Sequence, residues 1–300
     1  MTATIVPLPQ ISPRPRRVAV GSFDGVHLGH RAVIEGADAV LTFDPHPMSV
    51  ISPSSAPRLL TTLARKAELV GELGVEELVV IPFDEAFAHE GAQQFIDEVL
   101  VGALGATHVS VGENFRFGHK AVGDTDLLHA DSRFETRVVP LLELDGEIIS
   151  SSHIRGLIAG GAIEYAGQLL GNPFVVDGIV SHGEKRGRTL GFPTANLVPQ
   201  DSYAIPAHGV YACRARTADG VWHPAATSIG VRPQFVTGLG ELIEAFLIDF
   251  TGDLYDQPLR IEFLKRLRGE KRFESVDALL EQMARDVDEA RAFASLPRRP

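Results

Sequence analysis

The sequence predicts two domains of different class, an α/β domain with a parallel sheet followed by a small antiparallel β-barrel with a terminal helix. A length of 300 residues suits two domains. Strand-like runs alternate with helical segments as far as about residue 170, which favours a parallel sheet covered on both faces. From Phe174 onward the runs are short, β-rich and separated by glycine or proline, which is typical of a closed barrel.

The domain boundaries follow from composition. Residues 1–16 are proline-rich and lack the hydrophobic core of a secretion signal, so we expect a disordered leader there. The α/β domain then spans 17–171, and Gly171-Asn172-Pro173 marks the change to a barrel domain at 172–300. An amphipathic helix over about 275–293 is expected to pack on the barrel.

Composition limits the classes of partner. The net charge of −11 argues against a general nucleic-acid binder. The chain contains no uninterrupted run of about 18 apolar residues, so we expect no transmembrane helix. The single cysteine, Cys213, favours a cytoplasmic location and lies in a strand-like run, where a buried inert thiol fits better than a nucleophile. We therefore expect no nucleic acid and no membrane as partners, and the oligomeric state stays open.

The elements of the α/β domain follow in order along the chain. Strand-like apolar runs cover 18–20, 39–43, 78–81 and 108–112. The first crossover helix is brief, because Gly36 and Asp38 interrupt it. Thr61 or Thr62 can cap the next helix, which Gly74 can end, and residues 95–100 lie in another helix.

A glycine-rich turn follows the first strand, with the sequence Gly21-Ser22-Phe23-Asp24-Gly25-Val26-His27-Leu28-Gly29-His30. Glycines at a strand-to-helix turn let backbone approach a ligand closely. His27 and His30 can face one side, and Gly29 leaves room for an anionic group, so we interpret the turn as a phosphate site. A metal pair and a purely structural role for both histidines stay open, and Asp24 also suits a turn former.

Other polar residues follow strands of the same sheet, and ligands bind beyond the carboxyl ends of parallel strands. Asn114 lies in Glu113-Asn114-Phe115-Arg116-Phe117-Gly118, where it also suits a plain turn and the phenylalanines suit the core. Arg155 in Ser150-Ser151-Ser152-His153-Ile154-Arg155 would lie in a first helical turn, or on a solvated surface. His46, between two prolines, suits either a turn or a substrate contact.

The most specific motif lies in the barrel domain, Gly183-Glu184-Lys185-Arg186-Gly187-Arg188-Thr189-Leu190-Gly191-Phe192-Pro193-Thr194-Ala195-Asn196. Its basic glycine loop can wrap phosphates, and Thr194 and Asn196 can hold a hard cation such as Mg²⁺. Glu244 interrupts the apolar run 243–247. It either faces solvent by alternation or points into a site as a general base.

Together these motifs closely resemble the bacterial bifunctional riboflavin kinase/FMN adenylyltransferase family, also called FAD synthetase, over nearly the whole chain. The first half matches through the Gly21-to-His30 turn, Thr42-Phe43-Asp44-Pro45-His46-Pro47, Val111-Gly112 with the Asn114 loop, and Ser151-Ser152-His153-Ile154-Arg155. The second half matches through Gly-Arg-Thr-Leu-Gly-Phe-Pro-Thr-Ala-Asn, Gly209-Val210-Tyr211-Ala212, Ser228-Ile229-Gly230 and Asp253-Leu254-Tyr255.

The resemblance implies a Rossmann-like nucleotidyltransferase domain and a riboflavin kinase barrel. ATP would phosphorylate riboflavin to FMN, and a second ATP would adenylylate FMN to FAD with release of pyrophosphate. It further implies Glu244 as catalytic base, Thr194 and Asn196 as Mg²⁺ residues, and His27 and His30 as groups that stabilise phosphate charge. The other implied nucleotide- or phosphate-binding residues are Gly21, Phe23, Asp24, Gly25, Gly29, Asn114, Ser152, Arg155, Gly187, Gly191 and Pro193.

The chain departs from the family pattern in three places. The segment between His30 and Thr42 is about ten residues shorter than expected, which removes most of the first crossover helix. Ser152 and Gln234 stand where threonine is usual. The alternative is therefore a riboflavin kinase with an impaired adenylyltransferase domain. A third hypothesis, a flavin- or nucleotide-binding sensor or store, conflicts with the intact Glu244 and Phe-Pro-Thr-x-Asn turn.

Overall fold

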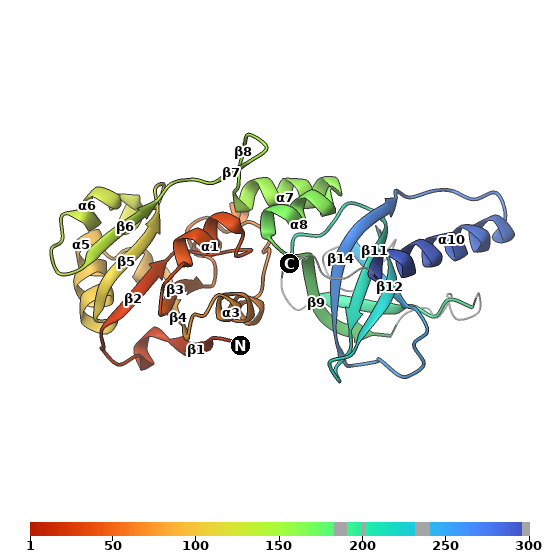
Figure 1. Ribbon diagram of the computed structural model, residues 1–300, viewed down its shortest axis with the longest axis horizontal. Helices are drawn as coiled ribbons and strands as arrows, with labels where there is room; N and C mark the ends of the chain where they lie inside the picture. Colours follow the sequence, from red (N-terminus) through yellow and green to blue (C-terminus); the bar gives the residue numbers. More distant parts are fainter. Residues whose placement is uncertain (183–190, 200–201, 232–240, 296–300) are drawn as a thin grey trace. The chain divides into compact units, whose positions relative to one another are not determined.

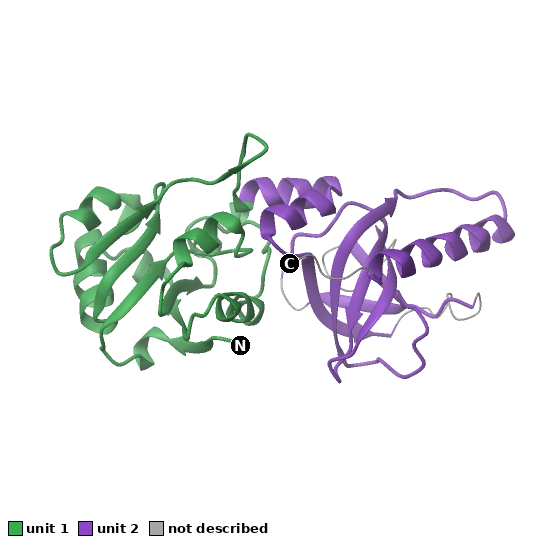
Figure 2. Cartoon of the chain, viewed as in Figure 1, with its two compact units in different colours: residues 1–151 green, residues 152–300 purple. Residues whose placement is uncertain are grey.

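The structure, a computed structural model, describes residues 1–182, 191–199, 202–231 and 241–295. The chain forms two compact units, Met1–Ser151 and Ser152–Pro300 (Figure 2). The first contains a six-stranded sheet and the second a closed barrel of six strands, with a helix at the end of the chain (Figure 1). The predicted fold class is confirmed.

The sheet of the first unit is parallel throughout, with the strand order β1-β4-β3-β2-β5-β6. Its strands are β1 (Thr4–Pro7), β2 (Arg16–Val20), β3 (Ala39–Asp44), β4 (Glu77–Pro82), β5 (Ala106–Gly112) and β6 (Glu135–Val139). The order reverses at β2, because β3 and β4 lie on one side of it while β5 and β6 lie on the other. The carboxyl ends of β2 and β5 therefore flank the topological switch point.

The expected disordered leader at 1–16 is wrong. Thr4–Pro7 form β1, which pairs with β4 at the edge of the sheet, and Leu8–Gln10 form the short helix η1. Ala3 is buried, and its N–H donates to the carbonyl of Ala67. Proline is tolerated in an edge strand, because the missing N–H is not needed by a neighbour on that side. A proline-rich composition therefore hid an ordered strand.

Helices cover both faces of the sheet, because successive strand residues point to opposite faces. Ala19, Val40 and Leu78 pack with α1 (Leu28–Ile34) and α3 (Leu63–Glu72). Val20 and Leu41 pack on the other face with α5 (Ala92–Gln94) and the π-helix η3 (Phe95–Ala103). The smaller elements are α2 (Pro47–Ile51), η2 (Pro53–Ser55), α4 (Glu85–Ala88), η4 (His119–Ala121), α6 (Thr125–His129), β7 (Glu143–Leu144) and β8 (Glu147–Ile148).

Two helices precede the barrel, α7 (Ser151–Gly160) and α8 (Ile163–Leu170). The compact units divide between Ser151 and Ser152, earlier than the expected boundary between residues 171 and 172. The reason is that α8 contacts β9 and β14 of the barrel, so both helices group with the second unit.

The barrel is antiparallel, in the order β10-β13-β12-β11-β14-β9. Its strands are β9 (Phe174–Ser181), β10 (Ala195–Pro199), β11 (Gly209–Arg216), β12 (Trp222–Val231), β13 (Glu241–Leu247) and β14 (Pro258–Arg268). Five of these match the β-rich runs expected from the sequence after Phe174, at 174–180, 209–215, 221–229, 243–250 and 259–263. The strand β10 was not expected, because its residues continue directly from the Phe-Pro-Thr turn. Cys213 is buried in β11, and burial raises the pKa of its thiol to about 12, consistent with an inert side chain.

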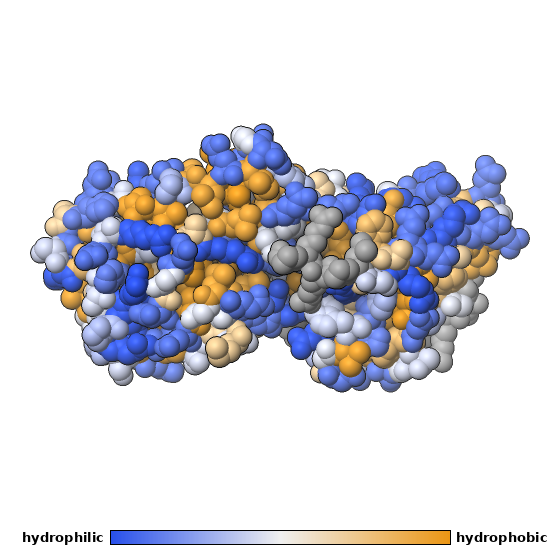
Figure 3. Space-filling model, in the orientation of Figure 1, coloured by the Kyte–Doolittle hydropathy of each residue, from blue (hydrophilic) through white to orange (hydrophobic). Residues whose placement is uncertain are grey.

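The terminal helix is α10 (Val276–Ala294), capped by Ser275, whose hydroxyl accepts from the N–H of Ala278. Its second half packs on the barrel through Val287 and Ala290, as predicted, whereas Val276 at its start is 58% exposed. The outer side of the helix is mostly hydrophilic (Figure 3). Among the described residues, no helix is long and apolar enough to cross a membrane.

Gly71→Ala is expected to lower the free energy of unfolding by about 1–3 kcal/mol, although alanine is the better helix former. An added Cβ in α3 would overlap three backbone atoms, Ala3 N, Met1 O and Thr2 C, and would displace the segment that leads into β1. Urea unfolding measures the change. Gly156→Ala in α7 is the matched control, because an added Cβ there has nothing within 4 Å. Equal stability of both variants would contradict the placement of the segment before β1.

Candidate active site

The turn after β2 reaches the switch point in a strained conformation. Phe23 and Val26 adopt φ values of +47° and +43°, which L-residues rarely occupy, and Gly25 lies at +91°. Such strain persists only where the surroundings fix the backbone. The turn is therefore held by contacts beyond its own sequence.

Asp24 supplies most of those contacts. Its side chain is buried, and its carboxylate accepts from the N–H of Leu60 at 2.9 Å and of Thr61 at 3.1 Å. The Thr61 hydroxyl accepts from the N–H of Gly25, and the Ser151 hydroxyl donates to the carbonyl of Asp24. The structure thus gives Asp24 the role of a turn former, while its nucleotide contact stays a prediction.

His27 and His30 stack on one another, with ring centroids 3.5 Å apart and an angle of 19° between the rings. His27 is buried and caps α1, because its Nδ1 accepts from the N–H of His30. Its hydrogen is therefore on Nε2. Phe23 meets His30 edge to face at 5.3 Å, so the pair is packed from a second side. The structure brings both histidines together, as the sequence predicted.

The glycines of the turn make room for its own aromatic rings. A Cβ at Gly29 would lie 3.2 Å from Cε1 of His27, and one at Gly21 would lie 3.1 Å from the Phe23 ring. The space beside Gly29 is therefore occupied by His27, which differs from the expectation that it leaves room for a ligand. It stays a prediction that the backbone of Gly21, Phe23, Gly25 and Gly29 binds phosphate.

The Asn114 loop follows β5, on the other side of the switch point. Asn114 is exposed, and Phe117 is buried in the core with Phe115 stacked against it at 5.5 Å. Glu113 anchors the loop start, because its N–H donates to the carbonyl of Val139. The phenylalanines pack in or against the core, whereas Asn114 is exposed.

Three other predicted residues lie on α7 and at the start of α2. Ser152 is exposed and Arg155 half-buried on α7, which begins at the unit boundary, so their phosphate roles stay predictions. His46 caps α2, because its Nδ1 accepts from the N–H of Met48 at 3.2 Å. This is the turn role that the sequence left open for His46.

In the barrel, direct strand pairing puts three polar residues in one row. Asn196 of β10 lies opposite Glu244 of β13, which lies opposite Ser228 of β12. Directly paired residues project from the same face of a sheet. Ile243 and Ala245 are buried inside the barrel, so this row lies on its outer face. Alternation thus places Glu244 on the outer face of the barrel, which is the first of the two orientations that the sequence left open.

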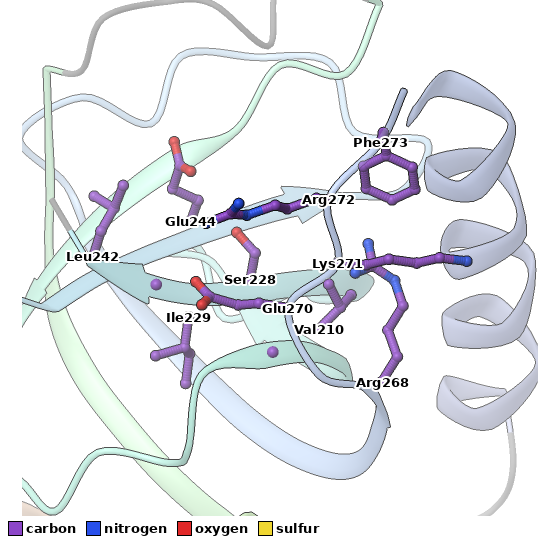
Figure 4. A pocket seen from close by; sticks show the side chains of 12 residues that line it. Val210, Ser228, Ile229, Leu242, Glu244, Arg268, Glu270, Lys271, Arg272 and Phe273 are labelled. Carbon is purple, nitrogen blue, oxygen red and sulfur yellow. The ribbon is translucent and has the colours of Figure 1, made fainter. Parts of the chain in front are cut away.

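That outer face is nevertheless hollowed beside Glu244. A cavity of about 580 Å³ lies there, and Figure 4 shows Glu244 and Ser228 among the side chains that line it, together with Glu270 and Arg272 from the segment 268–273. Its lining residues are Gly209, Val210, Ser228, Ile229, Gly230, Leu242, Glu244, Arg268, Glu270, Lys271, Arg272 and Phe273. Glu244 therefore faces a cavity of a size that suits a small-molecule ligand.

The segment 268–273 was missed by sequence analysis. Arg268 ties it to α10, because Nη2 donates to Oδ2 of the buried Asp286 at 2.7 Å and Nε donates to the same carboxylate. Arg268 and Lys271 also lie over the Phe273 ring, at 5.7 and 5.9 Å. The sequence feature that could have indicated this segment is a charged run that ends in an aromatic residue, between a strand and a helix.

The two residues predicted to bind Mg²⁺ lie on β10 and just before it. Asn196 is buried and leads the row that contains Glu244, while Thr194 is half-buried two residues before it. Gly191 (φ +83°) and Pro193 are exposed, and Gly187 lies outside the described residues. No cluster of three or more His, Cys, Asp or Glu side chains suitable for a metal occurs in the part of the chain that the structure describes.

Comparison with known proteins agrees with this two-part arrangement. A family model described as FAD synthetase matches residues 10–153, and one described as riboflavin kinase matches residues 170–294. The two matches define a class of two-module enzymes of flavin nucleotide synthesis.

Individual relatives match across both modules. The bifunctional riboflavin kinase/FMN adenylyltransferase of Listeria monocytogenes is 41% identical, over 92% of this chain and 91% of the relative. That of Bacillus subtilis is 40% identical, over 93% of each chain. A crystal structure described as a macrolide-efflux protein from Streptococcus pneumoniae is 31% identical, with a TM-score of 0.85 over 96% of this chain and 98% of that one.

The chain belongs to the bifunctional riboflavin kinase/FMN adenylyltransferase family. Because both domains are present, the enzyme with two activities is supported over the alternative of a riboflavin kinase alone.

Proposed function

We propose that the two reactions take place at the two sites described above, with riboflavin phosphorylated at the barrel cavity and FMN adenylylated at the β2–α1 turn. The observation that carries the kinase assignment is the row of Asn196, Glu244 and Ser228, of which Glu244 and Ser228 line the cavity. The substrates follow from the family: riboflavin, FMN and ATP.

At the barrel, Glu244 acts as general base. Its carboxylate takes the proton from the 5′-hydroxyl of riboflavin as that oxygen attacks the γ-phosphate of ATP. The products are FMN and ADP. Arg268, Lys271 and Arg272 line the same cavity and supply positive charge near a phosphorylated product.

Thr194 and Asn196 are proposed to hold Mg²⁺ together with ATP. A hydroxyl and an amide oxygen are ligands that this hard cation accepts, and Asn196 is a buried neighbour of Glu244 in the strand register. The ion, when bound, neutralises charge on the phosphates of ATP. The two side chains position the nucleotide beside the base.

At the β2–α1 turn, the phosphate of FMN attacks the α-phosphate of ATP and pyrophosphate leaves. His27 has its hydrogen on Nε2 and can donate it to phosphate oxygens, and His30 stacks beside it. Their contribution is stabilisation of transition-state charge, with Asn114 as a further donor. No covalent enzyme intermediate is required.

Glu244→Gln is expected to lower the rate of FMN formation about 10²- to 10⁴-fold, because glutamine keeps the shape of the side chain but cannot take a proton. The conversion of FMN to FAD should stay at the wild-type rate. Chromatography of both reactions measures the two rates separately. Glu241→Gln on the same strand is the control, since Glu241 does not line the cavity. Equal loss of both activities in Glu244→Gln would contradict separate sites.

His30→Ala is expected to have the opposite effect. The rate of FAD formation from FMN and ATP should fall about a hundredfold or more, since one group that stabilises phosphate charge is lost. Riboflavin phosphorylation should not change. His129→Ala, an exposed histidine at the end of α6, serves as the control. Wild-type FAD formation by His30→Ala would remove the histidine pair from the mechanism.

A further inference from the structure

A buried lysine lies beneath the phosphate turn. Lys66 of α3 is 7% exposed, and its Nζ donates to the carbonyl of Ser22 at 2.6 Å and to the hydroxyl of Thr42 at 3.1 Å. The Thr42 hydroxyl, itself buried on β3, donates to the same Ser22 carbonyl at 3.0 Å. An ammonium group and a hydroxyl thus converge on one carbonyl oxygen of the turn.

This arrangement fixes one peptide plane. The peptide bond between Ser22 and Phe23 is trans and planar, so its N–H points opposite to its C=O. With the Ser22 carbonyl held toward the buried Lys66, the N–H of Phe23 points to the opposite side of the peptide, away from Lys66. A carbonyl turned to that side would repel phosphate oxygens.

We infer that Lys66 is a positioning residue for adenylyl transfer, which holds the Ser22–Phe23 peptide with its N–H toward the ATP phosphates. The inference rests on the proposed function of this turn. Lys66 acts through the backbone, and its charge also adds positive potential beneath a turn that otherwise contains the buried carboxylate of Asp24.

The charge of Lys66 depends on its surroundings. Burial lowers the pKa of Lys66 to about 8, and the nearby carboxylates of Asp24 and Asp44 oppose that shift. The ammonium form is therefore present below about pH 8 and is lost as the pH rises through this value. Adenylyl transfer should decline over the same range, because neutral lysine is a weaker donor to the Ser22 carbonyl.

Lys66→Met tests the inference, because it removes the ammonium and keeps an unbranched side chain of similar length. The kcat of FAD formation from FMN and ATP should fall about ten- to a hundredfold at pH 7, with the KM for ATP changed less than the kcat. The decline above about pH 8 should disappear. Riboflavin phosphorylation by the same preparation is the internal control and should be unchanged.

Thr42→Val keeps the side-chain shape, so it tests the assignment even if Lys66→Met fails to fold. Loss of the hydroxyl removes one acceptor of the ammonium, which disfavours the charged form. The alkaline decline in the kcat of FAD formation should therefore move to lower pH, by about half to one unit. The pH profile of riboflavin phosphorylation should not move.

Each outcome decides one question. A wild-type enzyme that forms no FAD from FMN contradicts the proposed function of the turn. A wild-type enzyme that forms FAD with a flat profile from pH 7 to 9, or with a decline that stays fixed in Thr42→Val, overturns the role of Lys66. If Lys66→Met loses both activities equally, and the alkaline decline of FAD formation does not shift in Thr42→Val, the lysine serves folding alone.

Discussion

The reversal of strand order at β2 is the constraint on which the first unit depends. Parallel strands present their carboxyl ends at one edge of a sheet, and a reversal opens a crevice between the two strands where the chain changes direction. Here those strands are β2 and β5. The histidine turn follows one and the Asn114 loop follows the other, so the topology alone brings two segments that are distant in sequence to the same edge of the sheet.

Buried polar groups explain how the turn holds its shape beside a crossover helix of only seven residues. Asp24 binds the backbone of Leu60 and Thr61, while Lys66 and Thr42 bind the Ser22 carbonyl. These contacts come from segments far along the chain. The short helix α1 therefore contributes less to holding the turn than the sequence suggests. The contacts of Asp24, Lys66 and Thr42 maintain the positive φ values of the turn.

Much of the fold followed from hydrophobic periodicity, because β3, β4 and β5 are apolar runs and α10 has a capped amphipathic pattern. Strand β1 was missed because four residues among prolines give no such pattern. The histidines and glycines of the turn lie close together in the sequence, so their proximity could be predicted. The burial of Lys66 could not, since a lysine in a helix ordinarily lies on a solvated face. The placement of the segment 268–273 at the cavity that Glu244 lines depends on tertiary contacts such as Arg268 with Asp286, which no local pattern specifies.

A product time course tests most directly whether this one chain carries two separate phosphate-transfer sites. The protein is incubated with riboflavin, excess ATP and Mg²⁺, with pyrophosphate removed enzymatically, and flavins are separated by chromatography. Two sites predict that FMN appears first and that FAD then accumulates at its expense. Product that stops at FMN, with the enzyme still active in phosphorylation, would contradict the account.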